Sequence, residues 1–269
     1  MENKNYQWNA AEYAAHSSAQ SEWANELIEK LNLKGDEVLL DIGCGDGKVT
    51  AAIAEHLPDG HLVGIDSSQE MIDLTSRRYP ESDFPNLAFQ RTDVREMSFE
   101  NQFDVVFSNA ALHWVKDHVS MLRRIQKSMK KPGKILCQMG GRGNAEDIIS
   151  VFDELFERKK WRPYFENFIF PYGFYGPDDY EKWLTQAGLQ ARRVELIPKD
   201  MKHKGKEGLA GWIRTTWLPY TERIPGNMRE SFISDIIDNY LMSHPIDSQG
   251  FTHVRMVRLE VEASALGSD

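Results

Sequence analysis

Residues 38–48 read VLLDIGCGDGK, and this stretch decides the fold. Three apolar residues lead into Asp41, and glycine then recurs at every second position as far as Gly47. A short apolar run that ends in glycines is typical of a buried parallel strand that runs into a tight turn. Residues 49–57 follow with apolar side chains at helical spacing. We therefore expect the turn to open a helix N-terminus, as nucleotide-binding loops of doubly wound sheets do.

The spacing of these glycines differs from that of a dinucleotide-binding loop. The pattern G-x-G-x-x-G would place its third glycine at position 48, where this chain has Lys48. The next expected strand, 61–66, ends in Asp66, at about the place where a carboxylate accepts hydrogen bonds from ribose hydroxyls. Asp66 could instead cap the helix that follows it. Because Asp66 would suit a nicotinamide cofactor as well, a nicotinamide dehydrogenase is an alternative. Lys48, which stands in place of the third glycine, argues against it.

Strand-like and helix-like segments alternate from residue 37 to residue 139. A third expected strand is followed by Asp93, which is placed to accept a hydrogen bond from an adenine amino group. Asp41, Asp66 and Asp93 would then be three acids at the ends of three successive strands. Such alternation predicts a doubly wound parallel sheet with right-handed crossovers.

The second half of the chain follows a different pattern. Two strand-like segments, 189–198 and 252–261, flank a block with helical spacing, and residues 161–175 are dense in aromatic residues. We therefore predict an α/β fold: a Rossmann-like doubly wound sheet with an antiparallel C-terminal hairpin and a mostly helical cap. The expected organisation is one domain over 1–269, with N-terminal lid helices at 1–34, a cofactor-binding core at 35–143, and cap insertions at 160–177 and 199–250.

Composition narrows the classes of function. The formal net charge of −9 argues against binding to nucleic acid or to an anionic membrane, since phosphate backbones require clustered Lys and Arg. The two cysteines, Cys44 and Cys137, and the scattered histidines lack metal-ligand spacing, so no metal site is expected. With no secretory leader and no apolar run of membrane-spanning length, we expect a cytoplasmic protein. We also expect a monomer or a weak dimer.

The assembled pattern resembles the class I S-adenosylmethionine-dependent methyltransferases. Motif I of that family matches residues 41–47, and the segment after its fourth strand matches residues 109–114. Within the family, the chain is most similar to trans-aconitate 2-methyltransferases, nearly end to end, through residues 109–118, 138–139 and 211–219. It is also similar to juvenile hormone acid methyltransferases through His113-Trp114 and residues 18–20.

The resemblance implies S-adenosyl-L-methionine as cofactor and a methyltransferase activity on a small molecule. The residues that it assigns to cofactor binding come from the lead-in segment, the glycine loop, the strand ends and the start of the second helix: Tyr13, His16, Asp41, Gly43, Cys44, Gly45, Asp66, Ser67, Met71, Asp93, Val94, Asn109 and Ala110. The lead-in segment could equally be an ordinary solvated helix rather than a lid.

The most favoured acceptor group is a carboxylate, which is already ionised at neutral pH and needs no base. Gln20 and Trp114 could orient it as uncharged hydrogen-bond donors, with His113 beside them, while Trp212, Arg214 and Tyr220 of the cap could contact the rest of the acceptor. The lid lacks the arginines expected for a tricarboxylate, so a single carboxylate fits at least as well.

Alternatives remain open for this site. An amine or hydroxyl acceptor would need a base, which His16 or His113 could supply. His113 and Trp212 could also be core residues without a functional role. Finally, the chain could be a cofactor-binding module without catalysis, whose aromatic segment 161–175 forms an interface.

Overall fold

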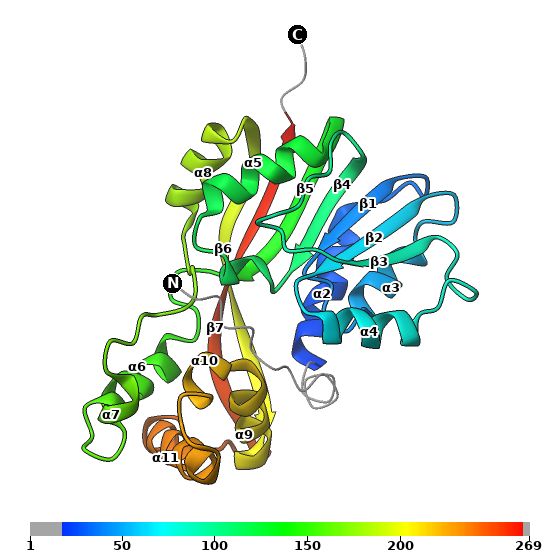
Figure 1. Ribbon diagram of the computed structural model, residues 1–269. Helices are drawn as coiled ribbons and strands as arrows, with labels where there is room; N and C mark the ends of the chain where they lie inside the picture. The colour runs from blue at the N-terminus through cyan, green and yellow to red at the C-terminus, as the bar shows by residue number, and fades with distance from the viewer. Residues whose placement is uncertain (1–17, 266–269) are drawn as a thin grey trace. The chain divides into compact units, whose positions relative to one another are not determined.

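The computed structural model describes residues 18–265 and contains a seven-stranded sheet (Figure 1). The strands lie in the order β3-β2-β1-β4-β5-β7-β6. Strands β1 to β5 pair in parallel, and β7 runs antiparallel to β5. The strand bounds are β1 Val38–Ile42, β2 His61–Asp66, β3 Leu87–Arg91, β4 Phe103–Asn109, β5 Met129–Gly140, β6 Leu189–Lys204 and β7 Phe251–Ala265. This confirms the doubly wound sheet with antiparallel C-terminal strands.

Two apolar clusters cover the two faces of this sheet. Neighbouring residues of β1 point to opposite faces, so Leu39 lies in one cluster and Leu40 in the other. The Leu39 cluster packs on helices α2 and α3, and the Leu40 cluster packs on α5 and α8. The helices of this part are α2 Ser18–Leu31, α3 Lys48–Ala54, α4 Gln69–Arg78, α5 His118–Ser128 and α8 Pro177–Gln186, with a 3₁₀ turn η1 at Leu112–Trp114.

The order of the strands reverses at β1, which pairs with β2 on one side and with β4 on the other. In open parallel sheets, ligands bind beyond the carboxyl ends of the strands at such a switch point. The loops that follow β1, β2 and β4 are therefore the expected place of a site.

A buried carboxylate connects α2 to the sheet. Glu260 of β7 has a side chain only 1 % exposed, and it accepts a hydrogen bond from Lys30 of α2 at 2.7 Å. The Gln138 amide donates to its other oxygen at 2.9 Å, and Arg193 forms a second ion pair with it. Burial disfavours a lone charge, but three donors compensate this one, so α2 is fixed along the sheet.

The chain divides into two compact units. The sheet unit comprises residues 20–142, 172–197 and 258–265, and the helical unit comprises residues 143–171 and 198–257. The outer ends of β6 and β7 belong to the helical unit. β6 continues to Lys204, beyond its expected end at 198, whereas β7 begins close to its expected start and continues past 261 within the sheet unit. The helices of the helical unit are α6 Glu146–Phe156, α7 Arg162–Phe165, α9 Gly205–Thr216, α10 Leu218–Thr221 and α11 Gly226–Ser243.

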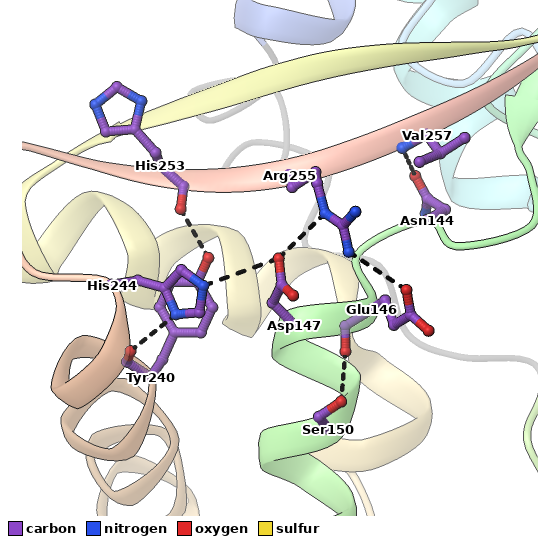
Figure 2. A network of polar contacts seen from close by, with 9 residues as sticks. All are labelled: Asn144, Glu146, Asp147, Ser150, Tyr240, His244, His253, Arg255 and Val257. Carbon is purple, nitrogen blue, oxygen red and sulfur yellow. Dashed lines mark hydrogen bonds and ion pairs between the residues drawn. The ribbon is translucent and has the colours of Figure 1, made fainter.

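Figure 2 shows how the N-terminal end of α6 is anchored within the helical unit. Asp147 lies 3.4 Å from the Arg255 guanidinium of β7 and 3.9 Å from His244, which follows α11. The Asn144 side chain accepts a hydrogen bond from the Val257 amide at 3.1 Å. Contacts to both α11 and β7 thus fix the start of α6. Among residues 18–265, no helix is long and apolar enough to cross a membrane.

Candidate active site

The glycine loop after β1 leaves open space beside its backbone. Gly43, Gly45 and Gly47 have φ values of +77°, +53° and +76°, a region that other residues rarely adopt. A Cβ on Gly43 would lie 2.2 Å from the Cβ of Ala111, so this glycine is needed for packing. A Cβ on Gly45 would have no neighbour within 4 Å among the described residues. The backbone at Gly45 can therefore accept a ligand that lies directly against it.

Two carboxylates flank this loop. Asp41 is 2 % exposed and accepts a hydrogen bond from the Thr50 hydroxyl at 2.7 Å. Burial raises the pKa of Asp41 to about 7. Asp66 accepts from the Gly45 amide at 3.1 Å and from the Ser68 amide at 2.8 Å, and burial raises its pKa as well. The raised pKa values mean that nearby donors and positive charges do not fully offset the burial of the two carboxylates. Both carboxylates therefore suit a ligand with hydrogen-bond donors or a positive charge.

Four aromatic rings lie together after β4, and we call them the aromatic wall: His113, Trp114, Tyr172 and Phe174. The rings of Trp114 and Tyr172 meet edge to face with centroids 4.8 Å apart, and Tyr172 stacks on Phe174 at 5.3 Å. His113 lies within 6 Å of the other three rings. The amide of Gly173 donates to the His113 carbonyl at 2.7 Å, which holds residues 172–174 against η1.

His113 is held as a neutral ring. The Gly140 amide donates to its Nδ1 at 3.4 Å, which leaves the hydrogen on Nε2. Burial, and after it the positive charge of Arg258, lower the pKa of His113 to about 3. Arg258, at the start of the sheet unit's part of β7, is 4 % exposed. The surroundings of His113 therefore oppose a second positive charge.

Comparison with known proteins assigns this geometry to a family. A family model described as a methyltransferase domain matches residues 33–188, which is more than half of the chain. The chain belongs to the methyltransferase domain family. It is a class I S-adenosylmethionine-dependent methyltransferase, and S-adenosylmethionine is its cofactor.

Curated relatives of this methyltransferase include trans-aconitate 2-methyltransferases. That of Deinococcus radiodurans is 29 % identical and covers 81 % of this chain and 84 % of its own. That of Methylobacterium nodulans is 26 % identical and covers 84 % of this chain and 86 % of its own. Among solved structures, phosphoethanolamine N-methyltransferase 2 of Haemonchus contortus matches with a TM-score of 0.61 at 19 % identity. That match covers 95 % of this chain and 56 % of the other, and it shows the shared fold.

The glycine loop and its two acids fit the cofactor. S-adenosylmethionine carries an ammonium group, a sulfonium and ribose hydroxyls, all of which are positive or donate hydrogen bonds. Asp41 and Asp66 are acceptors with raised pKa values, and open space adjoins Gly45. Cys44 is buried in the same loop, and its amide donates to the Ile65 carbonyl at 3.0 Å.

The remaining residues predicted for the cofactor lie at strand ends or at the start of a helix. Ser67 is exposed directly after β2, and Met71 is buried in the first turn of α4, which the Ser68 hydroxyl caps. Asn109 ends β4 and is half-buried, and Ala110 follows it with a φ of +58°. Tyr13 and His16 lie outside the described residues. Gln20 lies in the first turn of α2, and its side chain is outside the described part of the structure.

Asp93 has a partner that the sequence did not indicate. The guanidinium of Arg95 donates two hydrogen bonds from Nε to its oxygens, at 2.9 and 3.1 Å, and forms an ion pair through Nη2. Burial acts to raise the pKa of Asp93, but the bonds from Arg95 outweigh it and hold the pKa below its usual value. An adenine amino group would therefore share this carboxylate with Arg95. Val94, the next residue, is buried in the core of the sheet unit.

The three cap residues predicted to contact the acceptor all have partners within the helical unit. Trp212 and Tyr220 are each 1 % exposed. Tyr220 stacks on Phe152 with ring centroids 4.3 Å apart, and Arg214 pairs with Glu230 at 2.9 Å. This packing favours the alternative in which Trp212 and Tyr220 stabilise the helical unit. Acceptor contact by these three residues stays a prediction.

Sequence reasoning missed three residues beside His113. Tyr172 and Phe174 were expected in the cap, yet both belong to the sheet unit, where Tyr172 packs on Trp114 and Phe174 stacks on Tyr172. Arg258 was not singled out, because an arginine in a strand carries no motif. The density of aromatic residues in 161–175 was the one available signal for the first two. Among the described residues, no group of three or more His, Cys, Asp or Glu could hold a metal ion.

Proposed function

We propose that this methyltransferase transfers a methyl group to a carboxylate oxygen of a small-molecule acceptor. The observation that carries the proposal is the protonation state of His113, the imidazole of the aromatic wall. A histidine with a pKa of about 3 is a weak base and would not deprotonate an amine or a hydroxyl efficiently. A carboxylate acceptor needs no such step, because it is ionised at neutral pH.

The charge beside the wall supports the same conclusion. Arg258 lies close enough to His113 to lower its pKa, so its positive field reaches the wall. That field favours an anionic acceptor and disfavours a protonated amine. The relatives named trans-aconitate 2-methyltransferases, whose named substrate is a carboxylic acid, agree with this choice.

S-adenosylmethionine supplies a methyl group on a positively charged sulfur, which makes the carbon open to displacement by a nucleophile. The chain must then orient the carboxylate without neutralising it. The Trp114 indole N–H and the Gln20 amide are uncharged donors and suit this task. The aromatic wall excludes water from the oxygen that attacks. Asp41, Asp66 and the Gly45 backbone would hold the cofactor.

The parts of the chain would divide the work as the sequence suggests. In this proposal the whole chain, 1–269, is one methyltransferase domain, and residues 35–143 hold the cofactor. Residues 1–34 act as a lid that brings Tyr13, His16 and Gln20 to the reaction. The segments 160–177 and 199–250 select the acceptor.

A panel of three matched acceptors tests the choice of nucleophile. Phenylpropionic acid, phenylpropanol and phenylpropylamine share one carbon skeleton and differ in the reacting group. With radiolabelled cofactor, we expect label only on the acid, as a methyl ester that releases labelled methanol in mild alkali. With the cofactor kept at saturation at every pH, kcat/KM for the acid should change little between pH 6 and 9. Transfer to the amine, with a rate that rises with pH through a titrating base, would refute the carboxylate proposal.

Two tryptophan variants test the orienting role. Trp114→Phe should lower kcat/KM by about tenfold, the equivalent of roughly 1–1.5 kcal/mol for one hydrogen bond. Trp183→Phe is the matched control, because Trp183 packs on His118 and Tyr175 on the α8 face of the sheet unit. It should leave kcat/KM within about twofold. Equal losses in both variants would show that Trp114 acts through packing rather than by donating to the acceptor.

A further inference from the structure

A cavity opens in the helical unit, at the opposite end of α6 from the network in Figure 2. Its volume is about 620 Å³. The C-terminal half of α6, the short helix α7 and the segment after it form its lining: Asp153, Phe156, Glu157, Arg162, Phe165, Glu166, Asn167, Phe168 and Phe170. None of these residues belongs to the glycine loop or the aromatic wall. A cavity of this size can hold a small organic molecule.

The interior of this cavity is aromatic. Phe156 stacks on Phe165 with ring centroids 3.9 Å apart and meets Phe168 edge to face at 5.3 Å. Phe165 is buried, whereas Phe156, Phe168 and Phe170 are half-buried and keep part of their surface in the cavity. The Arg223 guanidinium lies 5.4 Å from the Phe168 ring centroid, so a ring of this cluster already takes a cation within the chain.

The rim of the cavity carries an excess of negative charge. Asp153, Glu157 and Glu166 outnumber the two bases at the cavity, Arg162 of its lining and Arg223 at the Phe168 ring. Among the described residues, none of these three acids forms an ion pair. Asp153 and Glu157 lie one helical turn apart, a spacing at which like charges repel. Partial burial raises the pKa of Asp153, which shows that its carboxylate lacks compensation.

The helix itself adds to this negative field. The C-terminal end of a helix carries partial negative charge and is normally balanced by Lys or Arg. The last turn of α6 has no basic residue, and Glu157 occupies its C-cap. Three bases follow the helix: Arg158 donates to Asn239, Lys160 pairs with Asp235 of α11, and Lys159 is exposed. Within α6 itself, no basic side chain balances the potential at this end.

We propose that this cavity binds a small organic cation with an apolar body, such as a quaternary or protonated amine. The phenylalanine rings would contact its apolar part and attract its charge by the cation–π interaction, and the acids of the rim would pair with it. The anchored N-terminal end of α6 holds Asp153 and Glu157 in place for such a ligand. Part of the cavity belongs to the segment 160–177, which the proposed function assigns to acceptor selection, but none of its residues is among those proposed to hold the cofactor or to orient the carboxylate. Binding here can therefore be measured without turnover.

Calorimetric titration of the full chain with benzyltrimethylammonium tests the proposal, with S-adenosylhomocysteine present at saturation to block the cofactor site. We expect saturable binding at one site in the millimolar range. Phenylacetate, similar in size but negative, and benzyl alcohol, which is neutral, should bind at least about tenfold more weakly, as the cation–π and charge contributions require.

Variants of α6 locate the binding. Glu157→Gln should raise Kd about threefold, and the Asp153→Asn/Glu157→Gln double variant about tenfold. The matched control is Glu154→Gln, an exposed acid on the same helix that does not line the cavity, and it should leave Kd within about 1.5-fold. Absence of binding, equal binding of phenylacetate, or an unchanged Kd in the double variant would each overturn the proposal. Because all variants lie on the surface, melting temperatures close to that of the wild type should accompany them.

Discussion

The residues that stand out in the sequence have different places in the two units: those of the sheet unit line a candidate site, whereas those of the helical unit are buried in its core. In the sheet unit, Asp41 and Asp66 stand at strand ends, where the backbone fixes their positions and the glycine loop leaves space beside them. In the helical unit, large aromatic side chains that stand out in the sequence, such as Trp212 and Tyr220, are buried in its core. A residue placed by a backbone motif can thus be assigned a role from sequence, whereas an abundance of aromatic residues first indicates a core.

The largest effect should come from the glycine loop, where two glycines differ sharply. Gly43→Ala forces a Cβ to within 2.2 Å of Ala111 and requires a residue with positive φ, so we expect a loss of about 3–5 kcal/mol of stability. Gly45→Ala meets no neighbour among the described residues and should cost only about 1 kcal/mol. Chemical denaturation measures both.

Cofactor affinity completes this test of the loop. Gly45→Ala should fold and yet bind S-adenosylhomocysteine at least about tenfold more weakly, since its methyl group would enter the space that the ligand needs. An unchanged dissociation constant for Gly45→Ala would show that the cofactor does not lie against this part of the loop.

The next largest effect concerns the buried carboxylate that connects α2 to the sheet. Glu260→Gln removes the charge that Lys30 and Arg193 share and should lower the free energy of unfolding by about 2 kcal/mol. Glu262→Gln, two residues further along β7, is the matched control. Its side chain is 44 % exposed and lies 3.5 Å from Arg193, so the loss should stay below about 0.5 kcal/mol. Equal losses of unfolding free energy in the two variants, measured by urea denaturation, would mean that the buried ion pairs of Glu260 stabilise the fold no more than the exposed ion pair of Glu262.

Two tryptophans, one from each unit, sharpen the comparison further. Trp212→Phe should lower stability by about 1.5 kcal/mol through the cavity it leaves, with kcat/KM nearly unchanged. Trp114→Phe should do the reverse, because Trp114 is half-buried in the aromatic wall. Melting temperature and kcat/KM are measured on both variants. A Trp212 variant with normal stability and a raised KM for the acceptor would restore its predicted role in acceptor binding.

The sequence predicted the sheet unit well because its signals are local. Strand, glycine turn and helix follow one another within residues 38–54, and the period of apolar residues alone separates them. Two helices of the second half, α9 and α11, were predicted for the same reason, since they form the block with helical spacing that was expected between the last two strands.

The contacts that complete the candidate site could not be predicted, because they join segments far apart in the chain. Tyr172 reaches Trp114 across more than fifty residues, and Arg258 acts on His113 from the last strand. The pair of Asp93 with Arg95 is local, but a motif that assigns Asp93 to a ligand says nothing of a competing guanidinium two residues away. The length of β6 was underestimated because its outer half belongs to the helical unit, whereas β7 was underestimated at its other end, within the sheet unit.

The smallest expected effect is a dependence on pH that sets the cofactor site apart from the rest of the molecule. Burial raises the pKa of Asp41 to about 7, so the carboxyl is largely protonated at pH 6 and ionised at pH 8. If Asp41 binds the ammonium group of S-adenosylhomocysteine, the ionised form is required. Affinity should then rise with pH by up to about tenfold per unit below pH 7 and level off above it.

The stability of the unliganded protein should change in the opposite direction. The folded state holds the Asp41 proton more tightly than the unfolded state does, so this group favours folding most at low pH, and its contribution declines as pH rises through 7. Asp41→Asn should flatten both curves, while the exposed Asp36→Asn should leave both unchanged. Calorimetry in buffers of different ionisation enthalpy should detect about half a proton released on binding near pH 7, and none in the Asp41 variant. Binding without proton release in the wild type would place the ammonium group away from Asp41.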